Sequence, residues 1–199
     1  PFLADVADSG GLLGEFGGRL WFRRWADGFG QALWSADGTV AGTRMLGDLR
    51  PGTDSFVVGQ LFPAGSRMFL NVQEKLWVSD GTAAGTREIG VQFPDLDKAV
   101  LLNGRLFFPA FNHDLSAYEL WVSDGSEAGT QRPPAASGER IANPTDLVAV
   151  GGRVWFLQGK KIWFTDGTTA GTAPLPSNEG DDFIGEHLTP AGGRLFFSG

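Results

Sequence analysis

The sequence of 199 residues predicts an all-β repeat protein. The main observation is a pattern that occurs four times, as LWSADGTVAGT, LWVSDGTAAGT, LWVSDGSEAGT and IWFTDGTTAGT, starting at Leu33, Leu76, Leu120 and Ile162. The aspartates of successive copies are 43, 44 and 42 residues apart, a period that marks a repeat architecture. The second observation is that no segment of useful length shows helical periodicity.

A second pattern precedes each copy and predicts a hairpin. It reads GGRLWF, GSRMFL, NGRLFF, GGRVWF and GGRLFF, with its arginines at Arg19, Arg67, Arg105, Arg153 and Arg194. Gly or Asn ahead of the arginine supplies the positive φ of a tight hairpin turn. Further short apolar runs precede each hairpin and follow each AGT. Each repeat therefore contains four short strands, named a, b, c and d, with the arginine at the a–b turn and Asp-Gly at the c–d turn.

Strands b and c are apolar on both faces, as in Leu20-Trp21-Phe22. A half-exposed strand would alternate apolar and polar residues, so these sheets must be covered on both sides. The blades of a β-propeller meet this demand because each is packed between its neighbours. Pro133, Pro134, Pro174 and Pro176 fall in the d strands of repeats three and four. Because proline is tolerated at sheet edges, d is expected to be the outer strand.

The two ends of the chain predict how the blades close. Residues 2–6 align with residues 45–49, so the chain opens with a d strand, and it ends with strands a and b of a fifth repeat. The sequence therefore predicts a single domain over residues 1–199, a five-bladed propeller whose fifth blade is shared between the termini. The alternative is a segment of a longer array that continues past Gly199.

Residues 119–126, ELWVSDGS, resemble the bacterial ELWxxDGT repeat family, and all four copies match in register. The acid is replaced by Ala32, Lys75 and Lys161 in the other copies. The resemblance implies propeller-type blades in a secreted or cell-surface bacterial protein and no enzymatic activity. No signal peptide is recognised at the start of the chain.

Composition excludes several classes of partner. The formal net charge of −7 argues against nucleic acid or an anionic membrane as the main partner. No apolar run reaches the roughly 18 residues that span a bilayer. Without cysteine there are no disulfides and no thiolate metal sites. No cofactor or metal is expected, because His113, Asp114, His187 and the acidic residues 178–182 form no ligand pattern.

The repeated polar and aromatic residues are expected to be structural. An aspartate before glycine commonly accepts the backbone N–H groups of its own turn, and these loops lack the ligand run of a calcium loop. Strand alternation puts both turns of a blade at one end, so arginine and aspartate can pair there. The aspartates are Asp37, Asp80, Asp124 and Asp166, and the tryptophans expected in the core are Trp34, Trp77, Trp121 and Trp163.

The opposite end, with the b–c and d–a loops, varies between repeats. The repeat arginine and aspartate are separated by 18, 13, 19 and 13 residues, so the first and third b–c loops are longer. Trp25, Phe29, His113 and Tyr118 on the long loops lie outside the repeat pattern, and aromatics there are candidates for stacking on a ligand. The alternative is that they fold back over their own loops. The short loops add the hydrogen-bonding side chains of Gln73, Glu74, Gln158 and Lys160.

These observations predict a non-catalytic binding module that contacts glycan or protein through this variable face. The first alternative is a purely architectural repeat segment without a ligand. A glycosidase-like enzyme comes third, because no paired-carboxylate or Ser-His-Asp spacing is recognisable.

Overall fold

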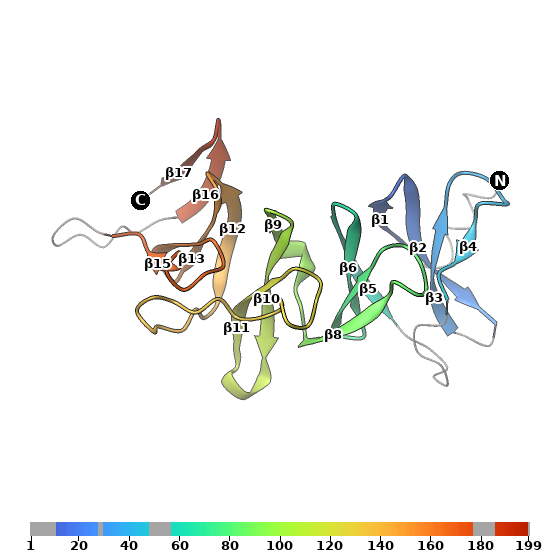
Figure 1. The fold of residues 1–199 in the computed structure, drawn as a ribbon, viewed down its shortest axis with the longest axis horizontal. Coiled ribbons are helices and arrows are strands. Elements are labelled where there is room, and N and C mark those ends of the chain that lie inside the picture. The colour runs from blue at the N-terminus through green and yellow to red at the C-terminus, as the bar shows by residue number, and fades with distance from the viewer. Residues whose placement is uncertain (1–10, 28–29, 48–56, 177–185, 199) are drawn as a thin grey trace. The chain divides into compact units, whose positions relative to one another are not determined.

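The computed structural model describes residues 11–27, 30–47, 57–176 and 186–198. The chain divides into two compact units, residues 1–91 and residues 92–199, and each is described by itself. The described residues contain many strands and two short 3-10 helices, η1 (Leu96–Lys98) and η2 (His113–Leu115) (Figure 1). The predicted all-β class is therefore confirmed. In the described part of the chain, no helix is long and apolar enough to cross a membrane.

The first unit contains the first two repeats, each folded as a four-stranded antiparallel sheet in sequential order. The strands of the first sheet are β1 (Leu12–Phe16), β2 (Arg19–Ala26), β3 (Gly30–Ala36) and β4 (Arg44–Met45). Those of the second are β5 (Val58–Ala64), β6 (Arg67–Val72), β7 (Lys75–Ser79) and β8 (Arg87–Gln92).

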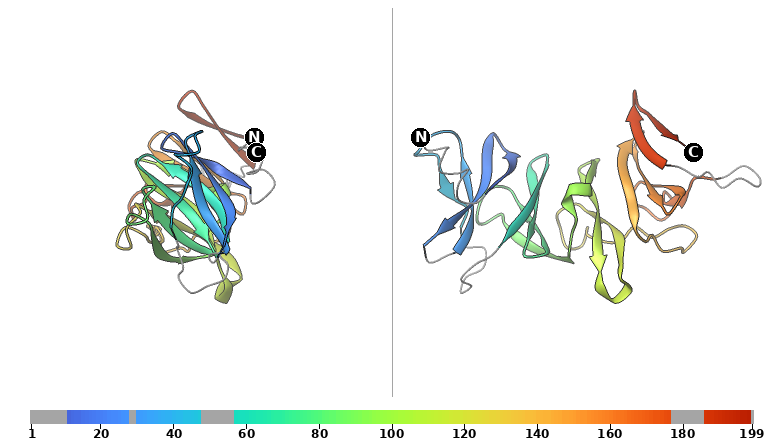
Figure 2. Two further views of the ribbon diagram at one scale, coloured as in Figure 1. Left: turned by 90° about the vertical axis from the view of Figure 1, so that its right-hand side faces the viewer. Right: turned by 180° about the vertical axis from the view of Figure 1, so that it is seen from behind.

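The second unit contains the remaining repeats. The third repeat forms a three-stranded sheet of β9 (Val100–Leu102), β10 (Arg105–Asn112) and β11 (Ala117–Ser123). The fourth forms a sheet of β12 (Pro144–Val150), β13 (Arg153–Gln158), β14 (Lys161–Thr165) and β15 (Ala173–Pro174). The hairpin of β16 (Glu186–Ala191) and β17 (Arg194–Ser198) lies beside the fourth sheet, as the views of Figures 1 and 2 agree.

Four complete blades were expected, and the third repeat departs from this. Its outer strand is reduced to a single antiparallel bridge between Val122 and Gln131. The physical reason is that Pro133 and Pro134 follow at once and have no N–H to donate to a ladder. The fourth repeat shows the same effect, because β15 is two residues long and ends at Pro174. The predicted weakness of the outer strands in these two repeats is confirmed.

The predicted five-bladed ring is not confirmed. No sheet among the described residues closes on itself. The strand expected at residues 2–6 lies outside the described residues. What the structure establishes is the coarser arrangement, a series of antiparallel sheets that follow the sequence repeat.

The a–b hairpins have the backbone that the sequence predicts. In the first, Gly17 and Gly18 have φ of 62° and 69°, and in the third Asn103 and Gly104 have φ of 51° and 74°. Two consecutive residues with positive φ are the requirement of a type I′ turn, whose twist matches that of the strands. The glycine or asparagine ahead of each arginine therefore starts a two-residue hairpin.

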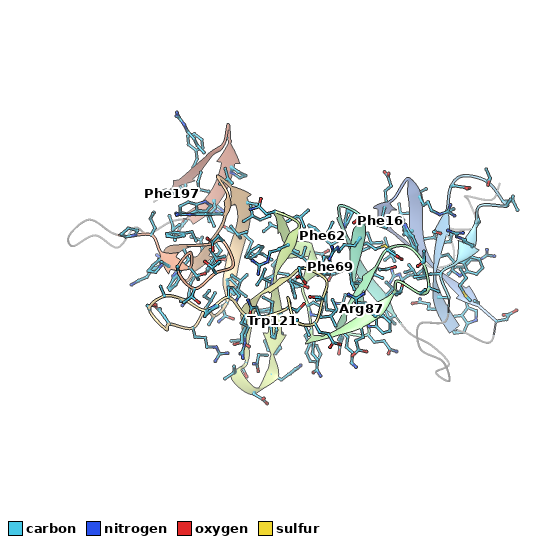
Figure 3. All side chains as sticks on the ribbon, viewed as in Figure 1. Phe16, Phe62, Phe69, Arg87, Trp121 and Phe197 are labelled. Carbon is cyan, nitrogen blue, oxygen red and sulfur yellow. The ribbon has the colours of Figure 1, made fainter. Side chains whose placement is uncertain are left out.

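The sheets pack face to face where two repeats meet within a unit. In the first unit, Trp21 and Leu33 from the first sheet pack with Leu70 and Trp77 from the second. Figure 3 labels Phe16, which belongs to the same cluster. In the second unit, Trp163 and Phe156 of the fourth sheet pack with apolar residues of the third, Phe107, Leu120 and Val122.

The four repeat tryptophans are not equally buried, which corrects the prediction that all lie in the core. Trp77 and Trp163 are 8% and 1% exposed. Trp34 and Trp121 are half-buried. A guanidinium group lies over each of these two rings, from Arg24 at 5.5 Å and from Arg132 at 5.7 Å. Their exposed faces are thus partly covered by the stems and charges of arginine side chains.

Candidate functional site

The Asp-Gly loop of the second repeat is a closed hydrogen-bond network. Asp80 Oδ1 accepts the backbone N–H of Thr82 at 2.8 Å and the Thr82 hydroxyl at 2.7 Å. The Thr82 hydroxyl oxygen accepts the N–H of Gly85 at 3.0 Å. Thr86 closes the loop by donating its hydroxyl to the Thr82 carbonyl. The prediction that Asp80 accepts hydrogen bonds within its own turn is confirmed.

The other three loops repeat this network, with Ser126 in place of the threonine in the third repeat. It also explains the second glycine of the pattern. A Cβ atom on any of these glycines would lie within 1.9–2.2 Å of the carboxylate of its own loop, at Gly42, Gly85, Gly129 and Gly171. Only glycine fits there, because the carboxylate occupies the space of a side chain.

Three of the loop carboxylates have a lowered pKa and are held ionised. Hydrogen bonds from the neighbouring threonine side chain and backbone lower the pKa of Asp37, Asp80 and Asp166 below the usual value of 3.8. The predicted pairing with the hairpin arginine occurs in the first repeat, where Arg19 Nη1 lies 3.5 Å from Asp37 Oδ2. In the fourth repeat, the guanidinium group of Arg153 lies over the Phe164 ring at 4.2 Å, and its charge also contributes to the lowered pKa of Asp166.

On the variable face of the first unit, Trp25 is 59% exposed and contributes to an open hollow of about 490 Å³. The hollow is also lined by Arg24, Asp27, Trp34 and other residues of the first sheet. A second open hollow, of about 530 Å³, is lined by Val57, Gly59, Asn71, Gln73 and Glu74. Phe29 lies outside the described residues. Trp25, Gln73 and Glu74 are therefore accessible as predicted, but they line separate hollows.

On the variable face of the second unit, His113 and Tyr118 pack against their own loop and against the segment that precedes the third sheet. The His113 ring meets the edges of Phe93 and Phe111 at centroid distances of 4.3 and 5.0 Å. Tyr118 lies edge-on to Phe111 at 5.2 Å, and the Lys98 ammonium lies over its ring at 5.3 Å. The contacts with Phe111 match the alternative prediction, in which these aromatics fold back over their own loop, whereas Phe93 and Lys98 come from the preceding segment.

Gln158 and Lys160 also differ in role. Gln158 Oε1 accepts the N–H of Ala142 at 3.3 Å, and its Nε2 donates to the carbonyl of Arg140 at 3.2 Å. Gln158 therefore supports the connection between the third and fourth repeats. Lys160 is exposed in the tight turn between β13 and β14. Among the described residues, no three histidine, cysteine or acidic side chains are grouped so that they could hold a metal ion.

The most organised polar cluster surrounds Glu119 of β11. This side chain is 3% exposed, and its Oε1 lies 2.8 Å from both Arg132 Nη1 and Arg140 Nη2. Asn112 Nδ2 donates to Oε2 at 2.8 Å. Burial raises the pKa of Glu119, but the hydrogen bonds and the arginine charges outweigh burial, so its pKa lies below the usual 4.5. A carboxylate paired in this way is a poor general base, because both oxygens are occupied and its proton affinity is reduced.

Sequence reasoning missed this cluster, although a signal for it was present. The residue before Leu-Trp is Lys75 in the second repeat and Glu119 in the third, and the second residue after AGT is Glu88 and then Arg132. Both charges reverse together between the repeats. Lys75 Nζ indeed lies 2.7 Å from Glu88 Oε1. Two positions that reverse charge in concert indicate a contact.

Comparison with known proteins identifies the fold and leaves the family open. Neither a family model nor a curated protein matches the chain. A solved structure of prolyl endopeptidases is similar at a TM-score of 0.55 and 16% identity, over 94% of this chain and 30% of that one. Puromycin hydrolase gives 0.47 and 15%, over 94% and 32% of the two chains. An α-L-arabinofuranosidase from Clostridium thermocellum gives 0.36 and 12%, over 84% and 72%.

These similarities support a β-propeller-like fold, since similar solved structures contain β-propeller domains. They also correct the predicted function. The similar structure with a TM-score above 0.5 is of prolyl endopeptidases, and it gives no support to a role as a non-catalytic binding module. Identities of 12–16% show the fold alone, so no activity follows from them. The chain spans about a third of the length of the prolyl endopeptidase.

Proposed function

We propose that this chain is an architectural segment that supplies propeller blades to a larger protein. One observation supports the proposal above all: the aspartate that recurs in every repeat accepts hydrogen bonds from the threonine or serine two residues later in its own loop. A residue that is fixed in each blade by its own turn stabilises that blade and is not available to a substrate. The repeat pattern is then explained by folding alone.

The buried charge of the second unit supports the same proposal. Glu119 is surrounded by Arg132, Arg140 and Asn112, which pair with both oxygens of its carboxylate. Because Arg132 and Arg140 belong to the connection between the third and fourth repeats, these contacts also hold that connection against the third sheet. A catalytic carboxylate needs a free oxygen that faces a substrate and a pKa near the working pH. Glu119 has neither property. We therefore propose that the described blades carry no catalytic centre.

The resemblance to the ELWxxDGT repeat family is part of this proposal, and with it a location in a secreted or cell-surface protein. The five-bladed arrangement, with residues 2–6 in the fifth blade, also stays a prediction. A chain without cysteine makes this testable, since two introduced cysteines would be the only thiols. Disulfide formation between position 4 and position 196 would support the shared blade.

The proposal is tested by assaying the purified chain for hydrolysis of proline-containing peptides and of aryl arabinofuranosides. We expect no turnover above the buffer rate. The control is Glu119→Gln, which changes the one buried carboxylate described in the sheets. Turnover by the natural chain that Glu119→Gln abolishes, while the variant stays folded by circular dichroism, would overturn the architectural proposal.

A further inference from the structure

Two repeats carry an ion pair at the same place with opposite polarity. In the second repeat, Lys75 of the inner strand β7 pairs with Glu88 of the outer strand β8 at 2.7 Å. In the third, Glu119 of β11 pairs with Arg132, just after the bridge that represents the outer strand, at 2.8 Å. Each pair lies within its own unit.

The two pairs are equivalent in the repeat. Lys75 and Glu119 each stand directly before Leu-Trp, and Glu88 and Arg132 each stand two residues after the threonine of AGT. The first and fourth repeats carry Ala32 with Met45 and Lys161 with Pro174 at these positions. No two of the four repeats share the same combination.

The outer strands gain from such a distinction because the loops before them do not tell them apart. The loops that lead into them are nearly identical in sequence and in hydrogen bonding. Three of the outer strands are also short, since β4 and β15 have two residues each and the third repeat has one bridge, whereas β8 has six residues. In repeat proteins, wrong association of similar elements is a characteristic failure of folding.

An exchange of outer strands between the second and third repeats would be penalised twice. Glu88 would meet Glu119, and Arg132 would meet Lys75, so both contacts would join like charges. The first contact is the more costly, because Glu119 is 3% exposed and would lose one of its two arginine partners while it faces a second carboxylate in a buried position. The native Lys75–Glu88 pair is about one-third exposed and adds little stability by itself.

We propose that the reversed ion pairs Lys75–Glu88 and Glu119–Arg132 determine which outer strand joins which repeat during folding. Their main contribution is discrimination against the exchanged strand, and the stability of the correct strand is secondary. This role of the charges is independent of the proposed architectural function, because it concerns how the blades form.

The decisive variant is Lys75→Glu with Glu88→Arg, which gives the second repeat the polarity of the third. The matched control is Lys75→Arg with Glu88→Asp, which keeps the natural polarity. Both are refolded from urea, and the yield and rate of native protein are compared. Pulsed hydrogen exchange follows the amides of Val122 and Gln131, which are bonded to each other's carbonyls at 2.8 and 2.9 Å in the native bridge.

We expect the reversed variant to match the control in melting temperature once folded, because a complementary pair is present in both. Its refolding yield falls below that of the control, and a fraction of molecules loses protection at Val122 and Gln131. Equal refolding yields and equal protection in the two variants would overturn the proposal.

A neutral variant, Lys75→Gln with Glu88→Gln, keeps the test decisive if the reversed variant is unstable. It removes both like-charge contacts of the exchanged state and leaves Glu119 and Arg132 unchanged. Its refolding yield is expected to lie between those of the control and the reversed variant. A neutral variant that refolds as well as the control, beside an unstable reversed variant, would also overturn the proposal.

Discussion

Gly129→Ala tests whether the carboxylate networks hold the repeat loops together. A Cβ atom at this position would lie 2.1 Å from Asp124 Oδ1, so the carboxylate must move. Its movement breaks the hydrogen bonds from the Ser126 N–H at 2.8 Å and from the Ser126 hydroxyl at 2.7 Å. The Ser126 hydroxyl then also loses its alignment with the N–H of Gly129, which it accepts at 2.9 Å.

The expected loss follows from these contacts. A hydrogen bond to a charged group contributes about 1.5–3 kcal/mol when it is buried. The loop is only half-buried, so water replaces part of what is lost, and we expect about 2–3 kcal/mol for the whole network. For a chain of this size, that corresponds to a fall of roughly 5–10 °C in melting temperature.

The assay is thermal unfolding followed by circular dichroism, with Gly90→Ala as the matched control. Gly90 lies in β8 without a positive φ, and a Cβ there would meet no heavy atom within 4 Å. Gly90→Ala should therefore be neutral or slightly stabilising. If Gly129→Ala melted at the same temperature as Gly90→Ala, the carboxylate network would not be what requires glycine at the end of the loop.

Two further predictions use single side chains of the sheets and loops. Trp21→Phe should lower the melting temperature more than Trp77→Phe. The Trp21 indole donates a hydrogen bond to the Phe16 carbonyl at 3.0 Å, whereas the buried Trp77 N–H has no acceptor among the described residues. Equal losses of melting temperature in the two variants would contradict this reasoning. Asp80 has a lowered pKa in the folded chain. Its contribution to the free energy of unfolding is therefore complete above the usual pKa of 3.8, and this contribution is lost as the pH falls through the lower pKa of the folded chain. Asp80→Asn should accordingly make the melting temperature less sensitive to acid, and an unchanged acid dependence would contradict the assigned hydrogen bonds.

Much of the fold could be predicted from the sequence because the same turn residues and short apolar runs recur in successive repeats. Several predicted features are local effects of a turn, namely the positive φ at Gly17 and Gly18 and the acceptor role of Asp80. The weak outer strands at Pro133 and Pro174 are a local effect of a missing N–H. Such effects depend on residues a few positions apart and need no knowledge of neighbouring sheets. The apolar runs likewise indicated that neighbouring residues of one strand are both buried, as Phe69 and Leu70 are.

The candidate site could not be predicted in the same way. Trp25 and Tyr118 are both aromatic residues on long loops, yet Trp25 stays 59% exposed while Tyr118 packs against Phe111 and Lys98. Which of these occurs depends on whether another segment supplies a partner, and periodicity carries no information on that point.

The sequence by itself determined the repeat, the strand order within each sheet and the turn chemistry, because all of these arise from contacts close along the chain. Only the tertiary structure decided that Glu119 is buried and that Arg140, 21 residues further on, reaches the same oxygen as Arg132. Burial and charge compensation depend on the distance between side chains in space. That distance is set by how the long connection after the third repeat folds back onto its sheet.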